Sequence, residues 1–178
     1  MANEAGQGCA DRSSNIGGYT FVSEGAPASQ GGNVVKLGCF CGAAAQESGT
    51  FAFFTAVGND LTAKAGTQVD FTVPAAADAC VEIEAPGDFT AFSVDAGNYL
   101  GCYVTNANSC EQDYSSSGGA GVWYISGDQT EGVGVTFSIW ANGIDGLNAD
   151  IEAGGVTTYE KEGFVIMHLY RMMEGYQE

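Results

Sequence analysis

The sequence predicts an all-β protein folded as a single, jelly-roll-like β-sandwich of about ten antiparallel strands. Short apolar-alternating runs are separated by clusters of Gly, Asn, Asp and Ser roughly every ten residues, which is the spacing typical of sandwiches. The chain has 27 glycines and only three prolines, and glycines interrupt almost every window long enough for a helix. The runs are rich in Val, Thr, Phe and Tyr, which favour strands. We therefore expect little helix before residue 160.

The expected strands follow one another through most of the chain. Period-two alternation is clearest in 68–73, where Val69, Phe71 and Val73 alternate with polar residues, and in 132–141. In chain order the expected strands are 19–23, 34–41, 50–57, 68–73, 80–85, 89–94, 98–105, 121–126, 132–141 and 156–161. We expect loops at 43–49, 58–66 and 106–120. Such a set of strands fits two packed sheets.

The domain organisation follows from length and composition. With 178 residues, of which 45% are hydrophobic, the chain is long enough for one well-filled core. We expect an N-terminal arm at 1–18, the sandwich core at 19–144, and a C-terminal extension at 145–178 in the form of a strand pair or swapped segment.

The end of this extension is unusually apolar. Eight of the ten residues in 164–173 are apolar and lie on every side of the segment, which indicates a strand buried on both faces or, alternatively, a C-terminal helix. A monomer rarely leaves such a patch in water, so we expect a homo-oligomer in which this segment forms the subunit contact or seals the sheet beneath it. The candidate contact residues are Phe164, Ile166, His168, Tyr170 and Met172.

The charge balance limits the partners. The chain carries 22 acidic and five basic residues, for a formal net charge of −17, and a field of that sign repels phosphate backbones and anionic lipid. Nucleic acid is therefore not an expected partner. No run of 18 apolar residues occurs, so membrane insertion is not expected. The polar stretch 1–14 has no export signal, although a removed signal replaced by Met1 would look the same.

Six cysteines, an even number in a glycine-rich chain, suit disulfides formed outside the reducing cytosol. We predict a bond between Cys102 and Cys110, which flank a Ser- and Asn-rich connection that can close comfortably. Cys39 and Cys41 lie on one strand face about 7 Å apart, too far for a mutual bond. Zinc sites usually use C-x₂-C pairs, which this chain lacks, so no metal or cofactor is expected. Free buried thiols remain the alternative to disulfides.

Catalytic patterns do not stand out. The only histidine is His168, inside the apolar run, whereas a general base must be paired with a nucleophile in a cleft. Glu82 and Glu84 share a strand face and could in principle form a catalytic pair. Acidic pairs are abundant in this chain, however, so we expect these two carboxylates to be solvated surface groups. We therefore expect no catalytic residues and no enzyme.

Two further polar or aromatic groups have ordinary explanations. The segment 142–150 carries four oxygen side chains that could bind calcium, but it misses the EF-hand spacing and is expected to be an Asn/Asp-Gly turn. Alternation places Trp123 and Tyr124 on opposite strand faces, so one of them should be exposed or at an interface. Together with Trp140, they are open to core packing, subunit contact or sugar stacking.

Seven motifs in a fixed order carry a resemblance that covers about two thirds of the chain. They are Gly-Ala-Pro-Ala-Ser at 25–29, the strand 35–41, Gly-Thr-Phe-Ala-Phe-Phe at 49–54, Phe-Ser-Val-Asp-Ala-Gly-Asn-Tyr-Leu-Gly at 92–101, Cys-Glu-Gln-Asp at 110–113, Ala-Gly-Val-Trp-Tyr-Ile-Ser-Gly-Asp at 120–128 and Val-Thr-Phe-Ser at 135–138. This order resembles a family of uncharacterised β-sandwich domains that recur in virion proteins of environmental tailed phages and in microbial surface proteins. The resemblance implies a non-enzymatic module displayed on a particle or cell. The extra cysteines and the long C-terminal segment depart from the family's pattern.

The functional expectation is a structural protein of an extracellular assembly, in particular a phage virion component such as a capsid decoration, tail fibre or spike that self-associates. Its partners would be its own copies and other virion or surface proteins. It would be made in the cytoplasm and end in an extracellular particle. The alternative is a secreted or cell-surface carbohydrate-binding module or adhesin with a glycan partner. A small hydrolase is the lesser alternative.

Overall fold

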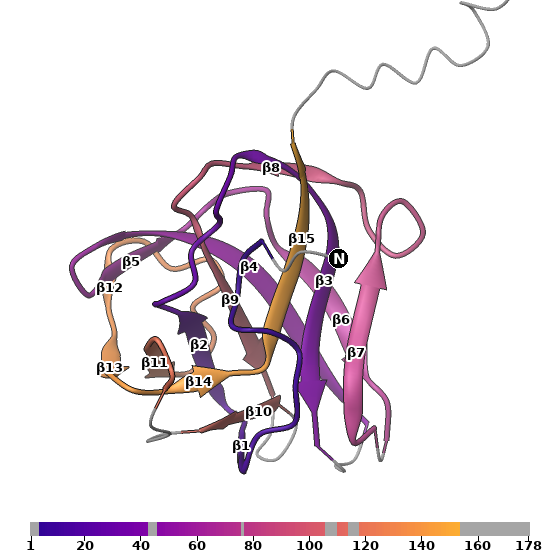
Figure 1. Cartoon of the computed structure of the whole chain (residues 1–178), viewed down its shortest axis with the longest axis vertical. Coiled ribbons are helices and arrows are strands. Elements are labelled where there is room, and N and C mark those ends of the chain that lie inside the picture. Colours follow the sequence, from indigo (N-terminus) through magenta and orange to yellow (C-terminus); the bar gives the residue numbers. More distant parts are fainter. Residues whose placement is uncertain (1–3, 43–45, 76, 106–109, 114–117, 154–178) are drawn as a thin grey trace, which may run out of the picture.

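The computed structural model describes residues 4–42, 46–75, 77–105, 110–113 and 118–153 (Figure 1). These residues form fifteen strands and no helix, so the expected all-β class is confirmed and the strand number exceeds ten. The strands are β1 (Ser14–Ile16), β2 (Tyr19–Ser23), β3 (Gly32–Cys41), β4 (Glu47–Val57), β5 (Asp60–Ala63), β6 (Val69–Val73), β7 (Ala79–Glu84), β8 (Phe92–Val94), β9 (Tyr99–Val104), β10 (Cys110–Asp113), β11 (Val122–Ser126), β12 (Val135–Thr136), β13 (Ser138–Trp140), β14 (Ile144–Asp145) and β15 (Leu147–Ala153).

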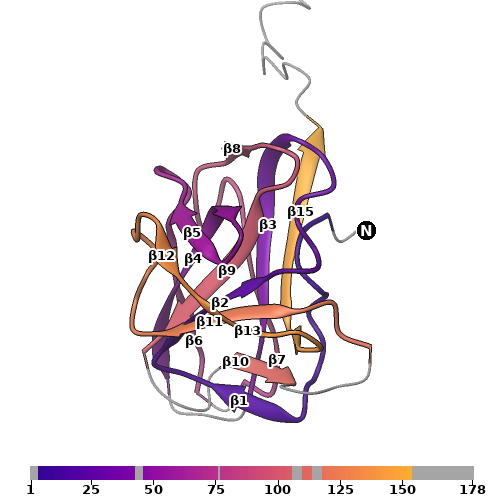
Figure 2. The same ribbon diagram turned by 90° about the vertical axis from the view of Figure 1, so that its left-hand side faces the viewer.

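The strands pair into two antiparallel sheets that pack against each other (Figures 1 and 2). Sheet A contains the seven strands β1, β3, β7, β8, β10, β14 and β15, and sheet B contains the other eight described strands. The chain passes repeatedly from one sheet to the other. Among the described strands, β4 and β5 are the one consecutive pair joined by hydrogen bonds. The predicted single sandwich is confirmed.

Strand β3 lies at the centre of sheet A. It pairs with β15 along one side, with β7 and β8 along the other, and with β10 at Cys41. The backbones of β3 and β15 approach closely at the start of β3, where a Cβ added to Gly32 would lie 2.1 Å from the carbonyl oxygen of Glu152. Only glycine leaves room for this approach of two backbones.

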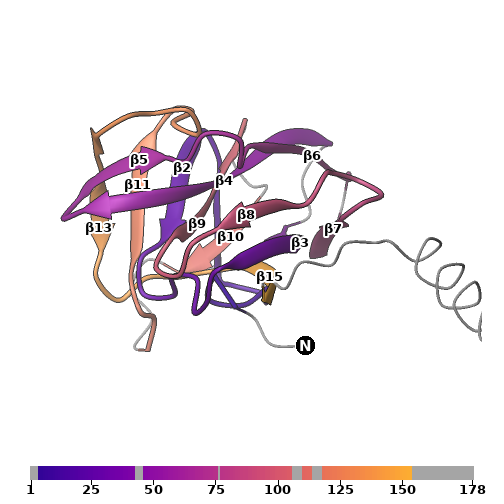
Figure 3. The same ribbon diagram turned by 90° about the horizontal axis from the view of Figure 1, so that it is seen from above.

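Sheet B curls until it nearly closes on itself (Figure 3). Its two end strands, β12 and β13, are separated in sequence by Phe137 alone, yet β12 pairs with β5 and β13 pairs with β11 at the opposite end of the strand order. The concave face is therefore filled by its own apolar cluster of Val22, Ala52, Phe54, Leu61, Trp123 and Phe137. We call this the barrel core.

A second, larger core lies between the two sheets. It includes Phe21, Leu37, Phe51, Phe53 and Leu100, none of which is measurably exposed. The residues of β4 alternate between the two cores: Phe51 and Phe53 belong to the intersheet core, and Ala52 and Phe54 belong to the barrel core. Burial on both faces explains why the sequence of β4 is a continuous apolar run instead of an alternating one.

The ends of the sandwich differ from the expected domain boundaries. The arm is not separate, because β1 pairs with β10 and the backbone of residues 4–8 bonds to Leu147 and Ala149 in β15. Strand β15, which was expected to lie in a C-terminal extension, pairs with β3 along its whole length. Within the described residues, the sandwich therefore includes both the arm and β15.

Several strands lie where loops were expected. Strand β5 falls within 58–66, β10 within 106–120, and β14 and β15 within or beside the expected turn 142–150. Conversely, the expected strand 132–141 divides into β12 and β13, because Phe137 turns into the barrel core between them. The expected strand 156–161 and the apolar segment 164–173 lie outside the described residues. In the part that is described, no helix has the length and apolar character needed to cross a membrane.

Candidate functional site

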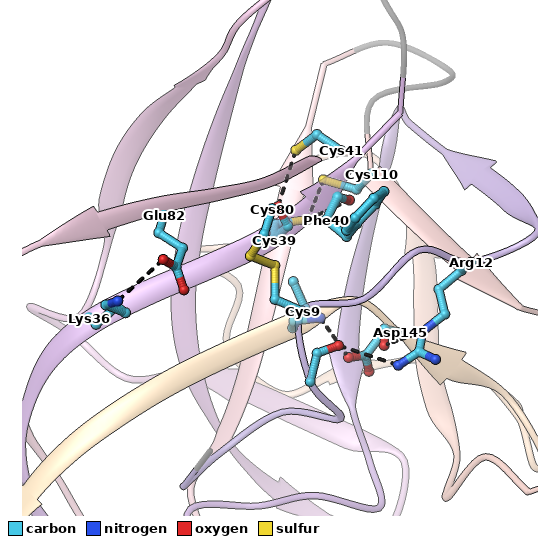
Figure 4. The surroundings of a disulfide bond; sticks show 12 residues. Cys9, Arg12, Lys36, Cys39, Phe40, Cys41, Cys80, Glu82, Cys110 and Asp145 are labelled. Atoms are coloured by element: carbon cyan, nitrogen blue, oxygen red, sulfur yellow. Dashed lines mark hydrogen bonds and ion pairs between the residues drawn. A yellow bond between two sulfur atoms is a disulfide. The ribbon is translucent and has the colours of Figure 1, made fainter. Parts of the chain in front are cut away.

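Four cysteines converge in the intersheet core, and we call them the cysteine cluster: Cys39, Cys41, Cys102 and Cys110. Cys39 and Cys41 are two residues apart on β3 and point to the same face, Cys110 on β10 is the Cα partner of Cys41, and Cys102 reaches in from β9 of sheet B. All four are completely buried. The Sγ atoms of Cys39, Cys41 and Cys110 lie within 4.8 Å of one another, and Cys39 Sγ lies 2.8 Å from Cys110 Sγ (Figure 4).

The four thiols differ in acidity. Burial raises the pKa of Cys39 and of Cys102, because an apolar core disfavours a thiolate. The hydrogen bond to Cys110 is the main cause that raises the pKa of Cys41. Burial alone would raise the pKa of Cys110 too, but hydrogen bonds from the other three thiols lower it well below its ordinary value. Cys110 is therefore the most acidic thiol of the cluster.

The disulfide in the structure is not the predicted one. It joins Cys9 of the N-terminal arm to Cys80 of β7, with 5.8 Å between the Cα atoms (Figure 4). Cys102 and Cys110 are free thiols, so the predicted Cys102–Cys110 bond is wrong for this structure. Both cysteines nevertheless belong to the same buried core. Spacing along the chain could not show that Cys110 has three cysteine neighbours.

A polar groove opens on the concave face of sheet B, beyond the end of the barrel core, since Thr50 on β4 shares the face of Ala52 and Phe54. Two adjoining hollows of about 350 and 650 Å³ share Thr50, Asp70 and Asp128. The groove floor is a row of paired residues, since Thr50 pairs with Asp70 on one side and with Tyr103 on the other. The further lining residues include Ser48, Thr72 and Thr105 on the floor and Gln68, Gln129, Thr130, Glu131 and Gly132 at the side.

Hydrogen bonds hold the walls of this groove in place. Asp128 Oδ1 accepts bonds from the backbone N–H and the hydroxyl of Thr130 at 2.9 and 2.7 Å. Gln68 Nε2 donates to the carbonyl oxygen of Thr130 at 2.8 Å, and the Thr50 hydroxyl donates to Asp70 Oδ1 at 2.8 Å. These bonds fix the side chains before any ligand arrives, which reduces the ordering cost of binding.

The expected acidic pair on β7 has a structural partner. Lys36 Nζ lies 3.2 Å from Glu82 Oε2 and 2.8 Å from Glu84 Oε1. Both carboxylates thus share one ammonium group across the β3–β7 ladder. Their position on one strand face was correctly predicted, and in the structure both side chains form ion pairs with Lys36.

The oxygen-rich segment 142–150 is built around a buried carboxylate. Asp145 is completely buried and accepts hydrogen bonds from Gln7 Nε2, the Ser23 hydroxyl and the backbone N–H of Leu147. Burial raises its pKa above the usual value. The expected turn is present at the start of the segment, where Asn142 is exposed and the N–H of Gly143 donates to the carbonyl oxygen of Trp140 at 2.8 Å. The later residues enter β14 and β15 instead. Asp145 anchors the N-terminal arm through Gln7 and through Arg12, which donates to its carbonyl oxygen (Figure 4).

The aromatic residues divide as alternation predicts. Trp123 lies in the barrel core and is 4% exposed, and its Nε1 donates to Asn59 Oδ1 at 3.0 Å. Tyr124 faces the other side and stacks on Trp140, with ring centroids 3.7 Å apart. Both rings are half-buried, and Tyr19, which is 39% exposed, lies beside Tyr124.

The other expected site residues are not placed. The oligomer-contact candidates Phe164, Ile166, His168, Tyr170 and Met172 lie outside the described residues. Within the described part, the one group of three or more His, Cys, Asp or Glu side chains that converge closely enough for a metal ion is Cys39, Cys41 and Cys110.

Comparison with known proteins does not extend this description. No protein-family model, curated protein or solved structure matches the chain.

Proposed function

We propose that this protein is a non-enzymatic structural component of an extracellular assembly, in particular a phage virion, in which it self-associates as a capsid-decorating, tail-fibre or spike protein. The observation that carries this proposal is the disulfide between Cys9 and Cys80. Bonds of this kind persist in oxidising surroundings and are rare in the reducing cytosol. A protein released with a particle meets such surroundings for its working life.

The surface and the sheet edges are consistent with this role. A net charge of −17 keeps particles soluble and apart by repulsion. In the described part of the chain, β7 and β8 pair with β3 alone, so one side of each strand has backbone groups that an added strand would satisfy. The order of seven motifs that resembles virion and surface sandwiches also supports the proposal.

Truncation after Gly163 tests self-association. We expect the full chain to be an oligomer in multi-angle light scattering and the truncated chain to be a monomer. The far-ultraviolet spectrum should stay β-type, because the described sandwich ends at Ala153. A truncated protein that assembles and melts like the full chain would contradict this prediction. The virion location is tested separately by immunogold electron microscopy of native source material, where gold on free protein alone would contradict it.

Glycan binding is a second candidate function, and the polar groove favours it. Tyr103 is a half-buried aromatic ring in a hollow lined with carboxylates, amides and hydroxyls. A sugar ring can stack on such a ring while its hydroxyls donate to carboxylates and exchange bonds with Thr and Gln side chains. The surrounding charges from Asp70, Asp128 and Glu131 favour a neutral or cationic glycan over an anionic one.

A glycan array followed by binding measurements on variants tests this second function. If a ligand is found, Tyr103→Ala should weaken binding about tenfold, the order of loss expected from one stacked ring. The matched control is Tyr19→Ala, which removes an exposed tyrosine outside the groove lining and should leave the affinity unchanged. Equal losses in both variants, or no bound glycan, would reject the groove as a sugar site.

A further inference from the structure

The cysteine cluster contains one very close contact between two sulfur atoms. Cys39 Sγ on β3 lies 2.8 Å from Cys110 Sγ on β10 (Figure 4), and both residues are completely buried. Two carbon atoms that are not bonded attract each other best at about 3.5 to 4.0 Å, and sulfur is larger than carbon. The two sulfurs are therefore closer than the contact distance of two separate thiols.

The other two thiols of the cluster have hydrogen-bond partners in the backbone. Cys41 Sγ lies 3.4 Å from the carbonyl oxygen of Cys39, and Cys102 Sγ lies 3.5 Å from that of Tyr103. An S–H group is a weak donor that can bond to such an oxygen. Cys39 Sγ also lies 3.4 Å from the carbonyl oxygen of Phe40, but the sulfur of Cys110 is nearer to it, at 2.8 Å.

The position of β10 gives a bond between Cys39 and Cys110 a structural role. Within the described residues, β10 pairs with β3 through one residue pair, Cys110 with Cys41. Strand β10 is also paired with β1 and with β14. Cys39 lies two residues before Cys41 on the same face of β3. A bond from Cys39 to Cys110 would therefore fasten β10 to the central strand of sheet A where the backbone supplies a single pair.

We infer that Cys39 and Cys110 form a second disulfide in the oxidising surroundings that maintain Cys9–Cys80, whereas Cys41 and Cys102 remain thiols. The two S–H groups transfer their hydrogens to an external disulfide such as oxidised glutathione. The S–S bond between Cys39 and Cys110 forms as the S–S bond of glutathione breaks, and two glutathione thiols are released. The inference does not depend on the proposed function, because any oxidising compartment supplies such an oxidant.

The two disulfides would lie on opposite faces of sheet A. Cys80 on β7 is the Cα partner of Phe40, and neighbouring residues of a strand point to opposite faces. Cys39, next to Phe40, therefore points away from the Cys9–Cys80 bond and into the intersheet core. The sheet separates the two bonds, so they do not exchange partners in the folded protein. Because Cys39 and Cys110 are completely buried, their oxidation takes place before the two sheets close.

A metal ion held by Cys39, Cys41 and Cys110 is the competing occupant, since their Sγ atoms lie within 4.8 Å of one another. Two sulfurs that bind one tetrahedral Zn²⁺ at about 2.3 Å lie about 3.8 Å apart. The distance of 2.8 Å between Cys39 Sγ and Cys110 Sγ is too short for that arrangement. Zinc binding would have to push these two sulfurs apart, whereas a disulfide completes their approach to about 2.05 Å. Three thiolates around a divalent ion would also leave a net negative charge in an apolar core, which is costly.

Mass spectrometry of the full chain tests the inference. The protein is folded in a glutathione redox buffer and then unfolded at acidic pH with N-ethylmaleimide and no reductant. We expect two alkylated cysteines, Cys41 and Cys102. After the added groups are subtracted, the mass should be about 4 Da below that of the reduced chain, since each disulfide removes two hydrogens.

A chymotryptic peptide map then assigns the bonds. Cleavage after Phe40 separates Cys39 from Cys41, and cleavage after Tyr103 separates Cys102 from Cys110. We expect one linked pair of peptides that contains Cys39 and Cys110.

Two double variants with equal numbers of cysteines provide the matched comparison. In Cys41→Ala/Cys102→Ala, both disulfides should form and no cysteine should be alkylated. In Cys39→Ala/Cys110→Ala, the two remaining cluster cysteines should both be alkylated.

Three results would overturn the inference. They are alkylation of Cys39 and Cys110 in the wild-type chain, linked peptides that pair Cys110 with Cys41 or Cys102, and a zinc ion retained in the native mass spectrum. The wild-type peptide map decides the matter even where a double variant fails to fold.

Discussion

Replacement of Cys9 and Cys80 by serine is expected to lower the free energy of unfolding by about 4 kcal/mol, among the largest effects of any change in this protein. The bond closes a loop with a sequence separation of 71 residues, and cross-linking so distant a pair removes much of the conformational freedom of the unfolded chain. Equilibrium unfolding in urea, without reductant, measures the loss.

The dependence on urea provides an internal check of that explanation. A chain without the cross-link is more expanded when unfolded, so the slope of unfolding free energy against urea should rise in the double variant. Comparison with the wild-type protein under the same non-reducing conditions leaves the cysteine cluster in the same state in both. Unchanged free energy and slope would mean that Cys9 and Cys80 are not joined in solution.

Trp123→Ala is expected to destabilise the protein by about 3 to 5 kcal/mol, as deletions of large buried aromatic side chains do. Trp123 fills the barrel core, where it meets the ring of Tyr99 edge-on at a centroid distance of 4.9 Å. Its removal leaves a cavity in a region closed by β5, β12 and Phe137. It also leaves Asn59 Oδ1 without its indole donor, which adds to the cost.

The neighbouring residue is the matched control for this substitution. Tyr124 lies one position along β11, is half-buried on the other face, and has Trp140 stacked on its ring. Tyr124→Ala should therefore cost only about 1 kcal/mol, the order of an aromatic pair at a partly exposed site. Chemical denaturation of both variants gives the comparison. Equal losses would show that the barrel core is not closed in solution as the structure has it.

The strands that could be predicted from the sequence are those with strong local signals. Strand β2 occupies the expected residues 19–23, and the buried positions Val69, Phe71 and Val73 of β6 follow the expected alternation. Such signals reflect the two-residue period of side chains along any strand. They do not depend on which strand lies alongside.

The strands that the sequence did not predict are stabilised by pairing with other strands more than by a pattern of their own. Strand β5 has four residues and β14 only two, too few for a period to be recognised. Strand β15 reads Leu-Asn-Ala-Asp-Ile-Glu-Ala, and its polar residues suggested a turn. Its pairing with β3, the central strand of sheet A, makes it part of the sandwich and places Leu147, Ala149 and Ile151 in the core.

The candidate site divides in the same way. Period two was enough to predict that Cys39 and Cys41 share a face, that Glu82 and Glu84 share a face, and that Trp123 and Tyr124 do not. Composition was enough to predict a disulfide somewhere among six cysteines, but not its partners, because Cys9 and Cys80 meet only when the arm docks beside β7. The groove around Tyr103 likewise needs residues from β4, β6, β9 and the loop at Asp128.

The amino-acid order alone therefore settled the all-β class, the positions of the well-patterned strands and the face to which their side chains point, because each of these is a property of neighbouring residues. Tertiary structure decided the closure of sheet B, the burial of Asp145, the cysteine cluster and the disulfide. Each of these depends on contacts between residues far apart in the chain. The local pattern of each strand does not specify which distant residues meet. Those contacts form only when the two sheets pack on a common core.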